Sequence, residues 1–311
     1  MIGKSIKPTH IAEQKILLTN KNKYMSKSIT RFRAYQLTTP GSSYSYAVDD
    51  YFILIEARYN DSNKASIREE MNICGCKYIT KLHITSWDDD HCNPNELSDL
   101  LANLLPTEIE MPGYPAATES ARSSKALIEQ YVRGRSYASS TEYTPTTIHG
   151  LSYAEARKYT DIIYNPKMIG SNANDNSTVK LFRRGRFTVL SLGDCEAPRI
   201  GQYIMNDSIV QTETDVMIVA HHGSDNSIMT TDFVSRINPQ IAICTSNYDN
   251  QFNHPTQRVR AMFGQRKLYT TKRGDVIIVC GEDNVGKAYN LVENNTTIED
   301  EYKFTPKLLI D

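Results

Sequence analysis

Residues 215–224 read DVMIVAHHGS, an apolar run that ends at two adjacent histidines, His221 and His222. A short apolar run bounded by polar residues is typical of a buried β-strand. Paired imidazoles directly after such a strand favour metal or phosphate chemistry over packing, because solvated loops seldom need two of them. We therefore interpret this stretch as a strand that carries functional side chains at its carboxyl end.

An acidic cluster follows another apolar run. Residues 78–85, YITKLHIT, predict a strand, and residues 86–91, SWDDDH, follow it and contain Asp88, Asp90 and His91. Adjacent carboxylates repel one another, and a nearby divalent cation would relieve that repulsion. An acidic turn that caps the next helix explains the same residues equally well.

Two weaker clusters complete the pattern. Asp194 follows Gly193 after the apolar run TVLSL, and His254 precedes Pro255. A Gly-Asp pair at a strand end is usually a turn, and a lone histidine before proline is ordinarily structural. Catalytic groups are nevertheless often held on loops at strand ends, where the scaffold is rigid.

Composition indicates a soluble globular protein. The chain has 311 residues, 40% hydrophobic, with 35 Lys and Arg against 36 Asp and Glu and a formal net charge of −1. This balance argues against a whole-surface electrostatic grip on nucleic acid but leaves a local basic groove open. No apolar run approaches the roughly 20 residues of a membrane helix, and the N-terminus lacks the apolar stretch of a signal peptide. We expect a cytoplasmic protein with no membrane partner, whose six cysteines are reduced packing residues.

The chain divides by pattern into a polar leader at 1–30, a body at 31–281 and a polar C-terminal tail at 282–311. Strand and helix patterns alternate in the body, which indicates an α/β protein. Within it, 112–160 is less regular and reads as an insertion that could cover a pocket. Helices are expected at 61–74, 95–105, 116–133, 231–237 and 256–263.

Taken together, these clusters resemble the metallo-β-lactamase fold hydrolases, with the hydrolase domain of ComEC-type competence proteins as the nearest branch. The motifs stand in family order: SWDDDH at 86–91, NDNS at 174–177, Gly-Asp at 193–194, HHGS at 221–224, His-Pro at 254–255 and Thr-x-x-Gly at 271–274. The resemblance spans about 31–281. It implies an αββα four-layer sandwich with metal ions at one edge of its two sheets.

The resemblance also implies that seven side chains gather at the metal centre: Asp88, Asp90, His91, Asp194, His221, His222 and His254. Asp194 would bridge two ions, and Asp88 would help to hold the second. Which of His221 and His222 binds the metal stays open. Strand alternation lets only one of them point inward, and we favour His221, with His222 orienting substrate or supporting a ligand from behind. His254 would be an additional ligand or a phosphate contact.

One departure from the family pattern matters. Ser86 stands where the first motif ordinarily begins with histidine, and His149, which lies in an irregular loop, does not replace the further histidine that the family places before Gly-Asp. We expect one or two divalent ions, zinc or manganese, with a weakened or absent second site. The oxygen-rich set tilts the choice toward manganese.

The expected function is hydrolysis of a phosphodiester by metal-activated hydroxide, most simply by a nuclease acting on DNA or RNA. Asp88 or Asp90 would orient the water, and His254 would aid the leaving group. Candidate phosphate contacts, which a solvated turn and helix face explain as well, are Arg183, Arg184, Arg186, Arg258, Arg260, Arg266, Lys267, Lys272 and Arg273. One alternative is a nucleotide or cyclic-nucleotide phosphodiesterase. Another is a degenerate metallo-β-lactamase fold that serves as a binding or assembly subunit, with partner proteins from a defence or mobile-element locus.

Overall fold

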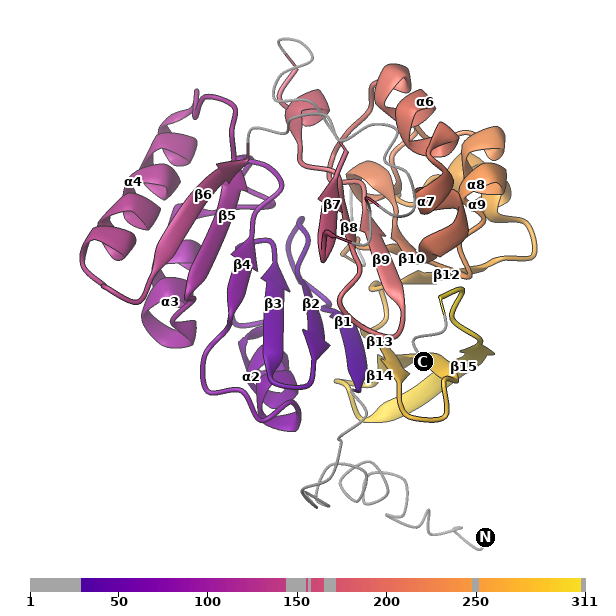
Figure 1. Cartoon of the computed structure of the whole chain (residues 1–311), viewed down its shortest axis with the longest axis horizontal. Coiled ribbons are helices and arrows are strands. Elements are labelled where there is room, and N and C mark those ends of the chain that lie inside the picture. Colours follow the sequence, from indigo (N-terminus) through magenta and orange to yellow (C-terminus); the bar gives the residue numbers. More distant parts are fainter. Residues whose placement is uncertain (1–28, 144–154, 156–157, 165–171, 248–251, 309–311) are drawn as a thin grey trace, which may run out of the picture.

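Two β-sheets stack face to face between two layers of helices (Figure 1). The computed structural model describes residues 29–143, 155, 158–164, 172–247 and 252–308. The first sheet has nine strands in the order β15-β14-β13-β1-β2-β3-β4-β5-β6, and the second has six in the order β12-β11-β10-β9-β8-β7. The predicted αββα four-layer sandwich is confirmed. Of the predicted leader, residues 1–28 lie outside the described residues.

The first sheet changes from antiparallel to parallel at β3. Its antiparallel part runs from β15 to β3, and the pairs β3–β4, β4–β5 and β5–β6 are parallel. The strands are β1 (Thr30–Ala34), β2 (Tyr44–Val48), β3 (Tyr51–Ile55), β4 (Lys81–His83), β5 (Glu108–Pro112), β6 (Ser139–Tyr143), β13 (Asp275–Cys280), β14 (Gly286–Val292) and β15 (Thr297–Phe304).

The second sheet also changes from antiparallel to parallel, at β9. Its first two pairs, β7–β8 and β8–β9, are antiparallel, and β9, β10, β11 and β12 run parallel. The strands are β7 (Asp161–Ile163), β8 (Lys180–Phe182), β9 (Thr188–Ser191), β10 (Thr214–Ile218), β11 (Ile241–Cys244) and β12 (Lys267–Thr270). The carboxyl ends of parallel strands meet at one edge of a sheet, which is where strand-end motifs converge.

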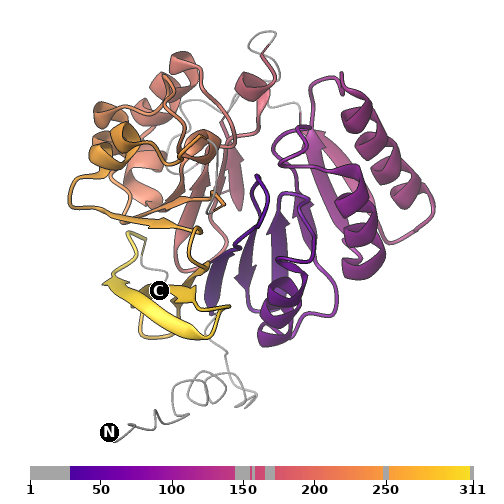
Figure 2. The same cartoon turned by 180° about the vertical axis from the view of Figure 1, so that it is seen from behind.

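Helices cover both outer faces (Figures 1 and 2). On the first sheet these are α2 (Lys64–Ile73), α3 (Pro94–Leu104) and α4 (Glu119–Arg133), and on the second they are α6 (Pro198–Asn206), α7 (Ser208–Glu213), α8 (Thr231–Ile237) and α9 (Gln257–Phe263). Helix α3 shows why: Leu97, Leu100, Leu101 and Leu104 form one buried stripe at helical spacing. Its first turn is capped by the side chain of Asn93.

Each pair of neighbouring layers buries its own apolar core. The two sheets pack on each other through large side chains such as Phe32, Tyr46, Phe182 and Phe187. Separate clusters lie between the first sheet and its helices and between the second sheet and its helices. No helix among the described residues is both long enough and apolar enough to cross a membrane.

Two of the predicted boundaries are wrong. Residues 112–143 are no insertion, because α4 packs on the sandwich and β6 pairs in parallel with β5; residues 144–154 and 156–157 of the predicted insertion lie outside the described residues. Likewise, 286–304 is no tail, because β14 and β15 extend the first sheet. The polar composition of β15 misleads because most of its side chains face solvent at the sheet edge, whereas Phe304 is buried.

Candidate metal centre

The loops that follow β4, β9 and β10 carry the three predicted motifs to one edge of the sandwich. Strand β4 leads into 86–91, β9 into Asp194, and β10 into the two histidines, which lie in a short 3-10 turn at Ala220–Gly223. The backbone amide of His221 donates to the carbonyl of Gly193, so the second and third loops are joined directly. The fold therefore brings residues of both sheets to one place.

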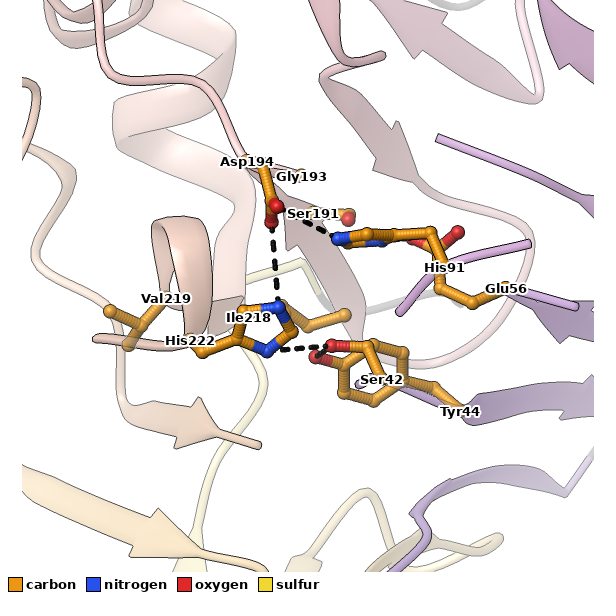
Figure 3. A pocket seen from close by; sticks show the side chains of 10 residues that line it. All are labelled: Ser42, Tyr44, Glu56, His91, Ser191, Gly193, Asp194, Ile218, Val219 and His222. Atoms are coloured by element: carbon orange, nitrogen blue, oxygen red, sulfur yellow. Dashed lines mark hydrogen bonds and ion pairs between the residues drawn. The ribbon is translucent and has the colours of Figure 1, made fainter. Parts of the chain in front are cut away.

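Four side chains converge there, with ligand atoms that all lie within 4.8 Å of one another: Asp90, His91, Asp194 and His222. His91 Nε2 lies 2.9 Å from Asp194 Oδ2 (Figure 3). His222 Nε2 lies 3.2 Å from Asp90 Oδ2. His91 Nε2 is buried, yet its contact with Asp194 lacks hydrogen-bond geometry, and it has no hydrogen-bond partner among the described residues. Two imidazole nitrogens and two carboxylates gathered this closely, one of the nitrogens buried and unsatisfied, fit a cation between them.

The electrostatics of this group also suit a cation. Burial opposes the protonated form of His91, but the carboxylates of Asp194, Glu56 and Asp90 outweigh it and raise its pKa well above the usual value. Burial likewise opposes the ionised forms of Asp90 and Asp194, but the two imidazoles lower the pKa of both carboxyls. In the metal-free protein a proton on His91 thus balances the carboxylates, and a divalent cation would replace it.

A buried carboxylate sits behind His91. Glu56, which follows β3 directly and is 1% exposed, has Oε1 at 3.2 Å from His91 Nδ1. Thr85 holds this carboxylate through its amide, 3.1 Å from Oε2, and its hydroxyl, 2.6 Å from Oε1. The Thr85 hydroxyl, which donates to Glu56, lies 3.3 Å from His91 Nδ1 and accepts its hydrogen bond. Glu56 and Thr85 together therefore favour a proton on Nδ1 and leave Nε2 as the nitrogen for a metal ion, as outer partners of metal-binding histidines do.

Hydroxyl groups orient the ring of His222 from behind. Ser42 Oγ lies 3.3 Å from His222 Nδ1 and 2.7 Å from Thr245 Oγ1, and the Tyr44 hydroxyl lies 2.8 Å from that threonine oxygen. The amide of Ser42 also donates to the carbonyl of Asp90 at 3.1 Å. With Nδ1 directed at Ser42, the Nε2 of His222 faces Asp90 and Asp194. A small pocket at the group is lined by Ser42, Tyr44, His91, Asp194 and His222, among others (Figure 3).

The choice of His221 over His222 as the inward histidine is wrong. His221 turns away from the group, and its Nδ1 lies 2.7 Å from Glu196 Oε1. Strand alternation fails here because β10 ends at Ile218 and both histidines have left-handed backbone conformations, with φ of 45° and 52°. The alternation of side chains along a strand therefore does not apply at these two positions.

Asp88 and His254 also lie outside the group of four. Asp88 Oδ2 accepts a hydrogen bond of 3.0 Å from Ser86 Oγ, and burial raises the pKa of Asp88 above its usual value. His254 stacks on Phe252, with ring centroids 5.5 Å apart, and its ring centroid is 6.5 Å from that of His221. Burial and the neighbouring charges of His222, His221 and Lys272 lower the pKa of His254 to about 4. His254 is therefore placed beside the centre as a neutral imidazole.

Most of the basic residues considered as phosphate contacts have partners within the chain. Ion pairs join Arg183 to Glu213, Arg258 to Asp225, Lys267 to Asp300 and Arg273 to Glu299. Further contacts join Arg184 to the ring of Tyr51, Arg186 to Asn284, Arg260 to the carbonyl of Pro255 and Arg266 to Asn238. The turn at 183–186 also precedes β9, whereas Asp194 follows it, so the two lie at opposite ends of that strand. The arginines of that turn therefore do not lie beside the centre.

Comparisons with known proteins give distant likenesses. No known protein-family model matches the chain. Over 109 residues it is 27% identical to ComE operon protein 3 of Bacillus subtilis, a match that spans 34% of this chain and only 14% of that protein.

Solved structures that are similar include the metallo-β-lactamase fold protein YhfI from Bacillus subtilis, with 10% identity, a TM-score of 0.48 and coverage of 81% of this chain and 100% of that one. Another is Igni18, a metallo hydrolase from Ignicoccus hospitalis, with 10% identity, a TM-score of 0.45 and coverage of 80% and 98%. The fold class rests on the sandwich and its sheet order rather than on these values.

Proposed function

We propose that the chain is a metal-dependent hydrolase of phosphodiester bonds whose substrate is a nucleic acid. The convergence of Asp90, His91, Asp194 and His222 carries this proposal. Two imidazole nitrogens and two carboxylates suit zinc or manganese. The donors fit such an ion because His91 Nε2 is buried without a hydrogen-bond partner in the described part of the chain.

A bound divalent cation would supply an activated water and would neutralise the non-bridging oxygens of a phosphate. The chain's own contribution is orientation. Glu56 and Ser42 fix the ring positions of His91 and His222 from behind, so that both Nε2 atoms face the centre. Asp90, held by the amide of Ser42 at its carbonyl and by His222 at its carboxylate, keeps its loop against the centre.

The surroundings favour a substrate with an aromatic base next to its phosphate. Phe252 is 63% exposed, although a phenyl ring gains free energy from burial, and it lies stacked on His254 beside the centre. Lys272 is near enough to contribute to the lowered pKa of His254. A base stacked on an aromatic ring adds about 1–3 kcal/mol to nucleic-acid binding. A phosphate at the centre and a base on Phe252 together describe a nucleotide unit.

Substrate assays with matched variants test this function. Protein loaded with manganese or zinc is incubated with single-stranded DNA, duplex DNA, RNA and cyclic nucleotides. We expect cleavage of a polynucleotide, its loss in Asp90→Asn, and a raised KM with little change in kcat in Phe252→Ala. Cleavage of cyclic nucleotides alone would favour the signalling phosphodiesterase. If metal-loaded protein consumed none of these substrates, the hydrolase assignment would fail and a binding or assembly role would stand instead. If Asp90→Asn retained the full rate, the activity would not belong to this centre.

A further inference from the structure

We propose that the chain holds one divalent cation and that Tyr114 and Ser86 close the adjoining position to a second. This inference rests on the proposed function, since it concerns the same centre. A second ion beside Asp194 would need donors from the loop at 86–91, and Asp88 and Ser86 are the residues of that loop that stand next to the group of four. The hydrogen bonds of these two residues decide whether they are available.

Ser86 has no hydrogen-bonding capacity left to offer. Its hydroxyl proton goes to Asp88 Oδ2 at 3.0 Å, so the hydroxyl of Tyr114, also at 3.0 Å, is the donor in its contact with Ser86 Oγ. The amide of Asp88 donates to the same oxygen at 3.2 Å. A serine hydroxyl has one proton and two lone pairs, and all three are engaged. A cation could bind this oxygen only by displacing one of these partners.

Tyr114 is fixed in place by its neighbour. Its hydroxyl oxygen accepts the backbone amide of Trp87 at 2.9 Å, and its carbonyl accepts the indole nitrogen of Trp87 at 3.1 Å. Ser86 is 0% exposed, Trp87 is 3% exposed and Tyr114 is 8% exposed. Displacing Tyr114 would therefore leave buried polar groups without partners, and each such group costs about 1–3 kcal/mol. A neutral hydroxyl gained as a ligand does not offset that cost.

The two halves of the centre are thus built differently. On one side, His91 presents a buried nitrogen that no hydrogen bond satisfies among the described residues. On the other, the Ser86 hydroxyl is bonded to Asp88 Oδ2 and backed by the phenol of Tyr114, so it has no lone pair left for an ion. A buried nitrogen without a hydrogen-bond partner gains from binding a metal ion. An oxygen whose lone pairs and proton are all used in hydrogen bonds must give up one of them to bind an ion. The position that Ser86 occupies is consequently part of the protein's packing rather than a ligand site.

Metal stoichiometry tests this inference. The purified chain is saturated with manganese, freed of excess ion and assayed for metal per chain by mass spectrometry, with folding checked by circular dichroism. We expect one equivalent in the wild type and well under one in Asp90→Asn, because the variant lacks one of the four ligands. We expect Ser86→His to remain at one, because Tyr114 still fills the position, and Ser86→His combined with Tyr114→Ala to bind a second.

The outcomes separate the two claims. Two equivalents in the wild type, a second equivalent in Ser86→His alone, or one equivalent in a folded double variant would overturn the closure by Tyr114. No metal in the wild type would instead overturn the proposed function. If the double variant does not fold, the wild type and the single variant Ser86→His still decide the question.

Discussion

Glu56→Gln should weaken metal binding without disturbing the fold. The carboxylate lies behind His91, with Oε1 at 3.2 Å from Nδ1, and the two groups of Thr85 hold it there. Glutamine keeps the shape and one acceptor oxygen but loses the negative charge. Outer partners of metal ligands typically contribute about 10–100-fold in affinity. We expect the dissociation constant for manganese or zinc to rise by about 10–100-fold.

The assay is a competition titration against a chromophoric chelator, with a matched control. Glu196 makes the same kind of contact with His221, which turns away from the centre, so Glu196→Gln should leave the metal affinity within about threefold of wild type, since its carboxylate backs no ligand. Glu56 also raises the pKa of His91 in the metal-free protein. Its removal therefore weakens the competing proton, and the ratio of variant to wild-type dissociation constants should widen as pH rises. Equal affinities for Glu56→Gln and wild type, with an intact fold, would refute the reasoning.

Three further predictions concern ligand choice, packing and pH. His222→Ala should lose at least about 100-fold in metal affinity while His221→Ala stays near wild type, since only His222 faces the group of four; the same chelator titration distinguishes them. Phe304→Ala should lower the free energy of unfolding by about 3–5 kcal/mol in urea titrations, because this buried ring belongs to the core between the sheets. Burial raises the pKa of Asp215 from 3.8 to about 6, so its ionisation opposes folding. Asp215 alone should subtract about 3 kcal/mol from stability as pH rises from about 4 to 6, and the difference in stability between Asp215→Asn and wild type should change by that amount over this range.

The sequence indicates those parts of the centre that follow strands directly. The apolar runs before His91, Asp194 and the histidine pair are long enough to reveal strands, and residues after parallel strands meet at one edge of a sheet. The helices at 231–237 and 256–263 are predictable because their apolar spacing and their capping residues lie within a short stretch of sequence.

The supporting residues could not be found this way. Ser42 and Thr245 act on His222 from loops far away in the chain, and nothing in their own sequence distinguishes them from ordinary polar loop residues. Glu56 offers one signal, because a carboxylate directly after the apolar run YFILI is costly to bury without a partner. The partner itself, His91, is known only once the sheet has brought β3 beside β4.

Local irregularity explains the wrong ligand choice. The alternation of side chains applies only while the backbone stays extended. Strand β10 ends at Ile218, and His221 and His222 have left-handed conformations, so alternation does not predict which of them points inward. The polar strand β15 was missed for a related reason, since an edge strand with one solvated face carries little apolar signal. Both errors come from tertiary context that overrides a local pattern.

The most direct measurement is an anomalous difference map from a crystal grown with zinc, recorded on both sides of the zinc absorption edge. The account predicts one strong peak between Asp90, His91, Asp194 and His222, within about 2.0–2.2 Å of a nitrogen or oxygen of each. A peak held by His221 or His254, or no peak among these four residues in a zinc-saturated crystal, would contradict it.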